Sequence, residues 1–156
     1  MVPQRIRRLD RGGWSLLELL VVCAIIWILA AITIPVIARY TRAATIRAGA
    51  QEMRTALLQA KQLAITRRQN ICVQPIAAPV NGYQFRQNNC AGAIIFMPGV
   101  NATGTFRLQN NVRLAGAGIT FRPLGDSTVG GVLTVTGPSN DVLTITVSVA
   151  GRVTSP

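Results

Sequence analysis

The feature that most limits what this chain can fold into is an apolar run close to its N-terminus. Trp14–Ile34 contains 21 residues and one charged side chain, Glu18. A helix needs about 20 apolar residues to cross the hydrocarbon core of a bilayer, so this run is long enough to span a membrane. The full sequence of 156 residues leaves room for one modest domain beyond such a span.

The residues before the run indicate its orientation. Residues 1–13 have a net charge of +3, from four arginines and Asp10. Because basic residues stay on the cytoplasmic side of a membrane, the chain after the run is expected to be exported. A cleavable secretory signal is the alternative, but its apolar core normally has about 7–15 residues and a small-residue cleavage site. This run is longer, and Pro35 follows it directly.

Glu18 is the unusual residue of the run. A carboxylate at the centre of a membrane helix costs about 2.5–3.5 kcal/mol, and somewhat less near the helix end. No basic residue lies between Gly13 and Arg39 to offset it. Cleavage after Gly13 would create a free ammonium group on Trp14, one helical turn from Glu18. On a neighbouring copy shifted along its axis, that ammonium would meet the carboxylate, which predicts an assembling protein.

The stretch Gly13-Trp14-Ser15-Leu16-Leu17-Glu18, followed by the apolar run and Pro35, resembles the type III signal of type IV pilins and type II secretion pseudopilins. In that family a prepilin peptidase cuts after the glycine and methylates the new N-terminus, and the glutamate is needed for filament assembly. The resemblance therefore implies cleavage between Gly13 and Trp14, with Glu18 as the assembly residue. It implies other pilins, the peptidase and inner-membrane lipid as partners. It also implies a bacterial inner-membrane location with a periplasmic C-terminal domain.

A second helical segment follows the proline. Pro35 lacks a backbone donor and obstructs the preceding turn, so we expect a kink there. Six apolar residues then recur at spacings of three and four, which places them on one face of a helix that should cover a sheet. This apolar stripe consists of Ile46, Ala50, Met53, Leu57, Ala60 and Ala64. The predicted organisation is a leader peptide at 1–13, a transmembrane helix at 14–35, an amphipathic helix at 36–69 and a β-rich domain at 70–156.

Basic residues recur every seven positions along the same segment, at Arg47, Arg54, Lys61 and Arg68. On a straight helix they flank the apolar stripe. Their stems are expected to cover the edge of the core while the charged heads reach water. A partner-binding ridge is the alternative. The helix should end near Arg68.

Residues 70–156 have the pattern of short strands and turns. Asn81-Gly82 and Pro98-Gly99 are turn pairs, and Gly137–Asp141 is a longer loop. In Leu143–Val149 apolar and polar residues alternate, which predicts one buried and one exposed face. The other expected strands are Ile71–Val73, Tyr83–Arg86, Ala93–Met97, Thr105–Leu108, Ile119–Arg122 and Gly131–Val135. The fold class is therefore α+β: a long N-terminal helix, with a transmembrane and an amphipathic half, packed on an antiparallel sheet as in pilins.

The chain has three cysteines. Cys23 lies in the apolar run and is expected to be a small buried hydrophobe. If the β-rich domain is exported, Cys72 and Cys90 are the natural disulfide pair. The alternative is two unpaired thiols in the core.

Arg47–Asn70 resembles the second helical block of FimT/FimU-type minor pilins and of the secretion pseudopilin GspH, and Val149–Val153 resembles their closing Gly-Arg strand. The resemblance implies a structural subunit of a type IV pilus, or alternatively a GspH-like pseudopilin of type II secretion. DNA binding for uptake is a third hypothesis. Some FimT-type pilins use a Gly-Arg-x-Arg motif, but here Thr154 replaces its second arginine. The candidate DNA-binding residues are Arg152, Arg107, Arg113 and Arg122, consistent with a net charge of +11.

Catalysis is the remaining class. The chain contains no histidine and only five acidic residues. Paired carboxylates, Cys/His dyads and metal clusters cannot be built from this set, so we expect no catalytic residue, no metal and no cofactor.

Overall fold

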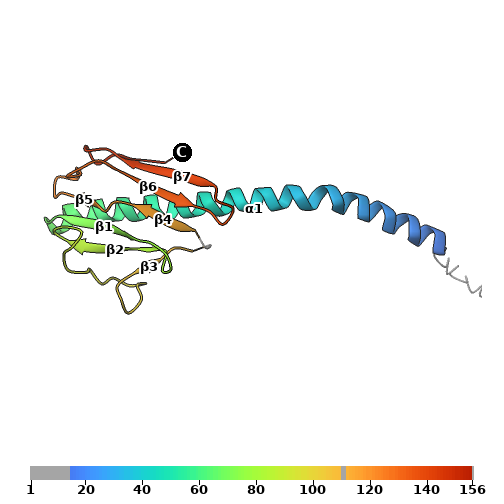
Figure 1. Cartoon of the computed structure of the whole chain (residues 1–156), viewed down its shortest axis with the longest axis horizontal. Helices are drawn as coiled ribbons and strands as arrows, with labels where there is room; N and C mark the ends of the chain where they lie inside the picture. The colour runs from blue at the N-terminus through green and yellow to red at the C-terminus, as the bar shows by residue number, and fades with distance from the viewer. Residues whose placement is uncertain (1–14, 110–111, 156) are drawn as a thin grey trace, which may run out of the picture. The chain divides into compact units, whose positions relative to one another are not determined.

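The computed structural model describes residues 15–109 and 112–155, and the chain divides into two units between Arg39 and Tyr40 (Figure 1). We call the residues up to Arg39 the helical unit and those from Tyr40 onward the head. In the head, the amphipathic half of the helix and all the strands form one unit.

The helix α1 extends over Leu16–Arg67. Its helical assignment continues through Pro35, so the proline does not end the helix. The kink at Pro35 stays a prediction.

The helix buries one face in the head. All six residues of the predicted apolar stripe are buried, and Met53, Leu57, Ala60 and Ala64 have no exposed surface. The prediction of this face is confirmed. Gly49 lies on the same face, where a Cβ would come within 2.9 Å of a Val112 methyl group. The small side chains of Ala and Gly on this face let the rest of the head approach the helix closely.

The C-terminal end of α1 is closed by backbone hydrogen bonds. Gln69 N donates to Ala64 O at 3.3 Å, and Arg68 N donates to Ile65 O at 3.4 Å. Arg68 has a φ of 52°, in the left-handed region. This is the Schellman pattern, which satisfies the carbonyl groups left free at a helix end. The helix therefore ends next to Arg68, as predicted from the sequence.

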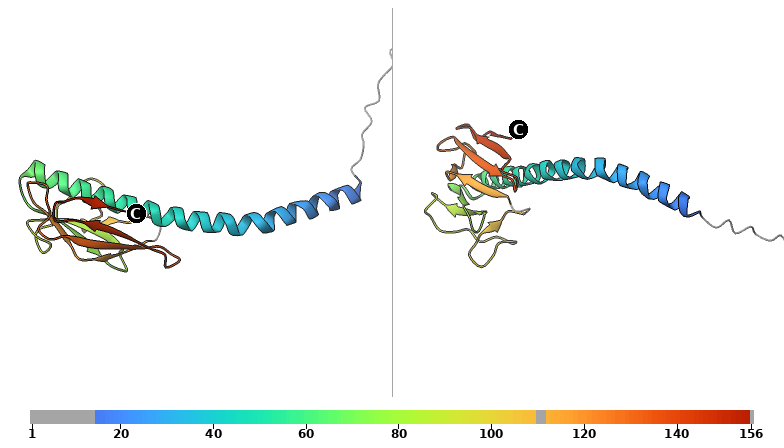
Figure 2. Two further views of the ribbon diagram at one scale, coloured as in Figure 1. Left: turned by 90° about the horizontal axis from the view of Figure 1, so that it is seen from above. Right: turned by 45° about the vertical axis from the view of Figure 1, so that its right-hand side comes forward.

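Within the described residues the strands form two four-stranded sheets, with orders β3-β2-β1-β5 and β4-β6-β7-β8, and every pair is antiparallel. The left-hand view of Figure 2 shows most strands on one side of the head's helix. One core cluster joins the helix and both sheets. The strands are β1 Ile71–Ile76, β2 Gly82–Gln87, β3 Phe106–Arg107, β4 Arg113–Gly116, β5 Ile119–Phe121, β6 Gly131–Thr136, β7 Val142–Val147 and β8 Val153–Thr154.

Two hairpin loops lie where the turn residues predicted them. The loop between β1 and β2 ends at Asn81, which has a φ of 47° and donates from its N–H to Ala77 O. The loop Gly137–Asp141 connects β6 to β7 and is closed by a hydrogen bond from Gly137 N to Asp141 O at 2.8 Å. Asparagine tolerates the left-handed backbone that such turns require.

Three details of the strand prediction were wrong. Ala93–Met97 forms only an isolated bridge between Ile94 and Arg86. The strand β4 was not predicted, because Arg113–Gly116 has little hydrophobic alternation and is held by its pairing with β6. Val149 is exposed rather than buried, since β7 ends at Val147 and a turn follows, closed by a bond from Gly151 N to Ser148 O.

Candidate assembly helix and head surfaces

The helical unit exposes nearly all of its apolar side chains. Leu16 is 82% exposed and Trp27 76% exposed. The helix has the length and composition to cross a membrane, and none of its most apolar window is buried. Cys23 is exposed too, contrary to the expectation of a buried hydrophobe, because a single helix has no surface of its own chain to pack against. This surface requires lipid or other helices to cover it.

Glu18 lies in the first turn of α1 and is exposed. Within the described residues its carboxylate has no hydrogen bond and no ion pair. The hydroxyl of Thr33, in contrast, donates to Leu29 O at 2.8 Å and so satisfies itself inside the helix. Glu18 is therefore a charged group on this apolar surface that needs a partner from outside the described part of the chain. The predicted cleavage and methylation site, Gly13 and Trp14, lies outside the described residues.

The basic residues spaced by seven do not behave as one set. Lys61 is half-buried and its Nζ donates to Gly151 O at 3.0 Å, which connects the helix to the turn before β8. Arg68 lies just beyond the last residue of α1. Arg47 and Arg54 are exposed, and neither has a hydrogen bond or ion pair within the described part of the chain. The four regularly spaced basic residues therefore have different roles: Lys61 stabilises the head, Arg68 ends the helix, and the other two are unpaired arginines.

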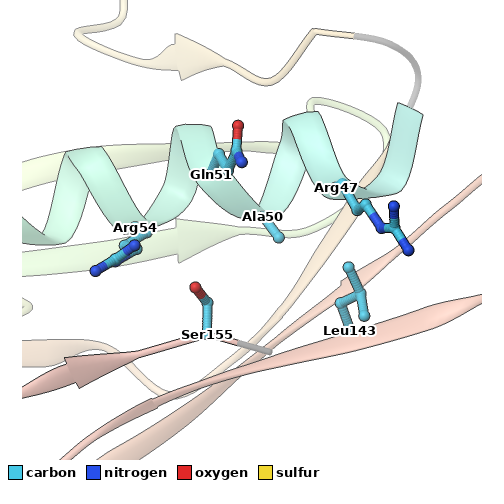
Figure 3. A pocket seen from close by; sticks show the side chains of 6 residues that line it. All are labelled: Arg47, Ala50, Gln51, Arg54, Leu143 and Ser155. Carbon is cyan, nitrogen blue, oxygen red and sulfur yellow. The ribbon is translucent and has the colours of Figure 1, made fainter. Parts of the chain in front are cut away.

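The two unpaired arginines border a groove between α1 and the second sheet (Figure 3). Its volume is about 220 Å³. Ala50 and Leu143 supply its apolar contacts and Ser155 supplies a hydroxyl, while Gln51 borders the groove with its amide pointing away from the strands. We call it the Arg47–Arg54 groove. The sequence indicated the arginines but not the groove, which depends on where the chain runs after β8.

The structure joins Cys72 to Cys90 in a disulfide, with Cα atoms 5.1 Å apart, so the predicted pairing is confirmed. Cys72 is fully buried on β1, and Cys90 lies in the connection after β2. Gly118 lies beneath the bridge: a Cβ there would collide with Cys90 Sγ and come within 3.1 Å of Cys72 Sγ. The bridge thus fixes the connection after β2 over the segment that leads into β5.

The four arginines considered for DNA binding lie in two places. Arg107 pairs with Gly82 at the Ile76 end of β1, whereas Arg122 follows Phe121, which pairs with Ile71 at the other end. The same separation holds in the second sheet, since Arg113 pairs with Thr136 at the far end of β6 from the turn that carries Arg152. All four are exposed, and Arg122 forms an ion pair with Asp126. No single patch contains them all.

Tyr83 is an acid–base group of the head whose pKa is strongly shifted. Burial raises the pKa of Tyr83 to about 12, and the negative charge of Glu52 adds to the shift. Its ring stacks on Phe106 with centroids 5.1 Å apart, so the residue belongs to the core. Among the described residues, no group of three or more Cys, Asp and Glu side chains could hold a metal ion.

Both the sequence and the fold of this chain are similar to those of known proteins. The family model for type II transport protein GspH matches residues 49–151. The structure is similar to the type IV minor pilin FimU of Pseudomonas aeruginosa strain PAO1, with a TM-score of 0.56, 16% identity, and coverage of 75% of this chain and 92% of FimU. It is also similar to the minor pseudopilin EpsH from the type 2 secretion system of Vibrio cholerae, with a TM-score of 0.52, 16% identity, and coverage of 69% and 92%. Comparison with curated protein sequences gave no significant match.

A long N-terminal helix packed on antiparallel sheets is thus the fold that this chain shares with a minor pilin and a minor pseudopilin. The chain belongs to the GspH family.

Proposed function

We propose that this protein is a minor subunit of a bacterial type IV filament, held in the inner membrane by its helical unit, with the head in the periplasm. The family assignment supports an assembling, structural role rather than a catalytic one. The exposed apolar surface of residues 16–39 supports membrane anchoring. The Cys72–Cys90 disulfide supports an oxidising compartment for the head, since such bonds persist outside the cytoplasm.

The observation that carries the proposal is the unpaired Glu18 on an otherwise apolar helix surface. In the proposed mechanism, the prepilin peptidase cuts after Gly13 and methylates the amino group of Trp14. The resulting cation of one subunit meets the Glu18 carboxylate of the subunit beside it. Both charges would otherwise lie uncompensated in lipid, so pairing favours insertion into the filament over staying alone in the membrane.

The filament we propose is a pilus, in which the protein acts in assembly or initiation as FimU-type subunits do. A pseudopilus of type II secretion is the alternative and uses the same helix-to-helix contacts. Deletion of the gene separates the two: a pilus subunit is needed for surface pili, whereas a pseudopilus subunit is needed for release of exported proteins.

Glu18→Gln tests the mechanism, because it keeps the size of the side chain and removes its charge. We expect the variant to insert into the membrane and to be processed to a chain that starts at Trp14, as mass spectrometry would show, but to be missing from sheared filaments. Glu18→Asp, which keeps the charge, is the matched variant and should retain part of the incorporation. Normal incorporation of Glu18→Gln, or an intact leader on the filament subunit, would contradict the proposal.

A further inference from the structure

We infer that the Arg47–Arg54 groove is the docking site for an acidic segment of a different protein, and not for a second copy of this chain. The groove lies between α1 and the β7–β8 side of the second sheet (Figure 3). The inference uses the proposed function only to identify that protein as another subunit of the same filament.

The two guanidinium groups set the ligand's charge. Arg47 and Arg54 lie seven residues apart on one helix, so their Cα atoms are about 10 Å apart along the axis. Their side chains extend in opposite directions along the helix (Figure 3). Each is exposed, and neither has an anionic partner among the described residues. Arginine forks bind carboxylates in a defined plane, so the matching ligand is a segment with two carboxylates, one for each guanidinium group.

The other residues of the groove favour a peptide over a nucleic acid. Ala50 and Leu143 provide apolar contact, and the Ser155 hydroxyl points towards the helix as a donor and acceptor suited to a peptide backbone (Figure 3). Grooves that hold single-stranded nucleic acid use aromatic side chains on which bases stack. None of the six residues that line this groove is aromatic.

The charge of the head excludes a second copy as the occupant. Residues 40–156 contain eleven Arg and Lys and three Asp and Glu, a net charge of +8. Asp126 is paired with Arg122, and Glu52 accepts a hydrogen bond from Gln109 N at 3.5 Å. Asp141 is the remaining acid, and one carboxylate cannot match two guanidinium groups while two heads of this charge repel each other. The partner must therefore be a different and more acidic chain.

The test uses the full chain in detergent micelles with a capped hexaglutamate peptide as the probe, observed by NMR. We expect the Gln51 and Ser155 backbone amide signals to shift on addition of hexaglutamate and not of hexaglutamine. Arg47→Gln combined with Arg54→Gln should weaken binding about tenfold, the effect of two surface ion pairs of about 0.7 kcal/mol each. Arg107→Gln combined with Arg113→Gln removes the same charge from exposed positions outside the groove and should weaken binding less than about twofold.

Three results would overturn the inference. Equal weakening by both double variants would mean that hexaglutamate responds only to net charge. Shifts confined to other parts of the head would place the site elsewhere. Tighter binding of hexathymidylate than of hexaglutamate in the groove would make nucleic acid the occupant. Since this binding is measured without the filament machinery, its failure is distinguishable from failure of the Glu18 mechanism, which is measured by incorporation in cells.

Discussion

Removal of the Cys72–Cys90 disulfide should be the most informative change to the stability of the head. The bond closes a loop with a sequence separation of 18 residues. In the chain-entropy model, loss of a loop of this length costs about 3 kcal/mol at 25 °C, because the unfolded chain gains conformations that the bridge forbids. For a domain of roughly 120 residues, 1 kcal/mol corresponds to about 3–4 °C, so we expect the melting temperature to fall by about 10 °C.

The measurement is thermal unfolding of the full chain in detergent, followed by circular dichroism at a wavelength dominated by the strands. Cys72→Ala combined with Cys90→Ala should lower the melting temperature without reductant, and reductant should lower that of the wild type by a similar amount. Cys23→Ala is the matched control, because Cys23 is exposed and unpaired. It should leave the melting temperature unchanged.

The double variant should itself be insensitive to reductant, since it has no bond left to reduce. If reductant lowers the melting temperature of the double variant as much as that of the wild type, the loss does not come from the bridge. If the wild type and the double variant melt at the same temperature, loop closure does not stabilise the head and the reasoning is refuted.

Two further predictions concern the core of the head. Gly118→Ala should cost about 1–3 kcal/mol by overpacking, because its Cβ would collide with Cys90 Sγ and with Gln74 Oε1. The end of the Gln74 side chain can move aside, so most of the cost should disappear when Cys90 is also changed to alanine. An unchanged cost in this double-mutant cycle would show that the bridge is not what excludes the side chain. Tyr83 should ionise with a pKa of about 12 in an ultraviolet titration. In the unfolded chain its pKa is about 10, so the native state holds the proton more tightly. The free energy of unfolding should therefore fall between about pH 10 and pH 12. Tyr83→Phe should remove that fall in stability. If the fall persists in this variant, another group causes it.

The sequence predicted the parts of this protein that depend on local periodicity. The long apolar run is visible directly, and the buried stripe from Ile46 to Ala64 follows from helical spacing alone. The loop Gly137–Asp141 follows from residues that favour turns. The disulfide was predicted from the expected export of the domain, with unpaired thiols as the alternative. The structure confirms the disulfide.

Other features were not predictable, because they depend on which distant segments become neighbours. The seven-residue spacing does not distinguish Lys61, which bonds to Gly151, from Arg54, which borders the groove. The strand β4 has a weak pattern of its own and exists through its pairing with β6. The division into two sheets likewise has no signal in any single strand.

Composition and spacing thus determined an apolar helix with one carboxylate, an amphipathic continuation and a β-rich domain, since burial of apolar side chains imposes its period on the sequence. Tertiary structure decided which charged groups were left without partners. The pairing of strands far apart in the sequence placed the four arginines considered for DNA binding at two ends of the sheets. The position of Ser155, after β8, created the groove beside Arg47 and Arg54. Such positions depend on which strands pair with one another, and that pairing cannot be read from the residues of any one strand alone.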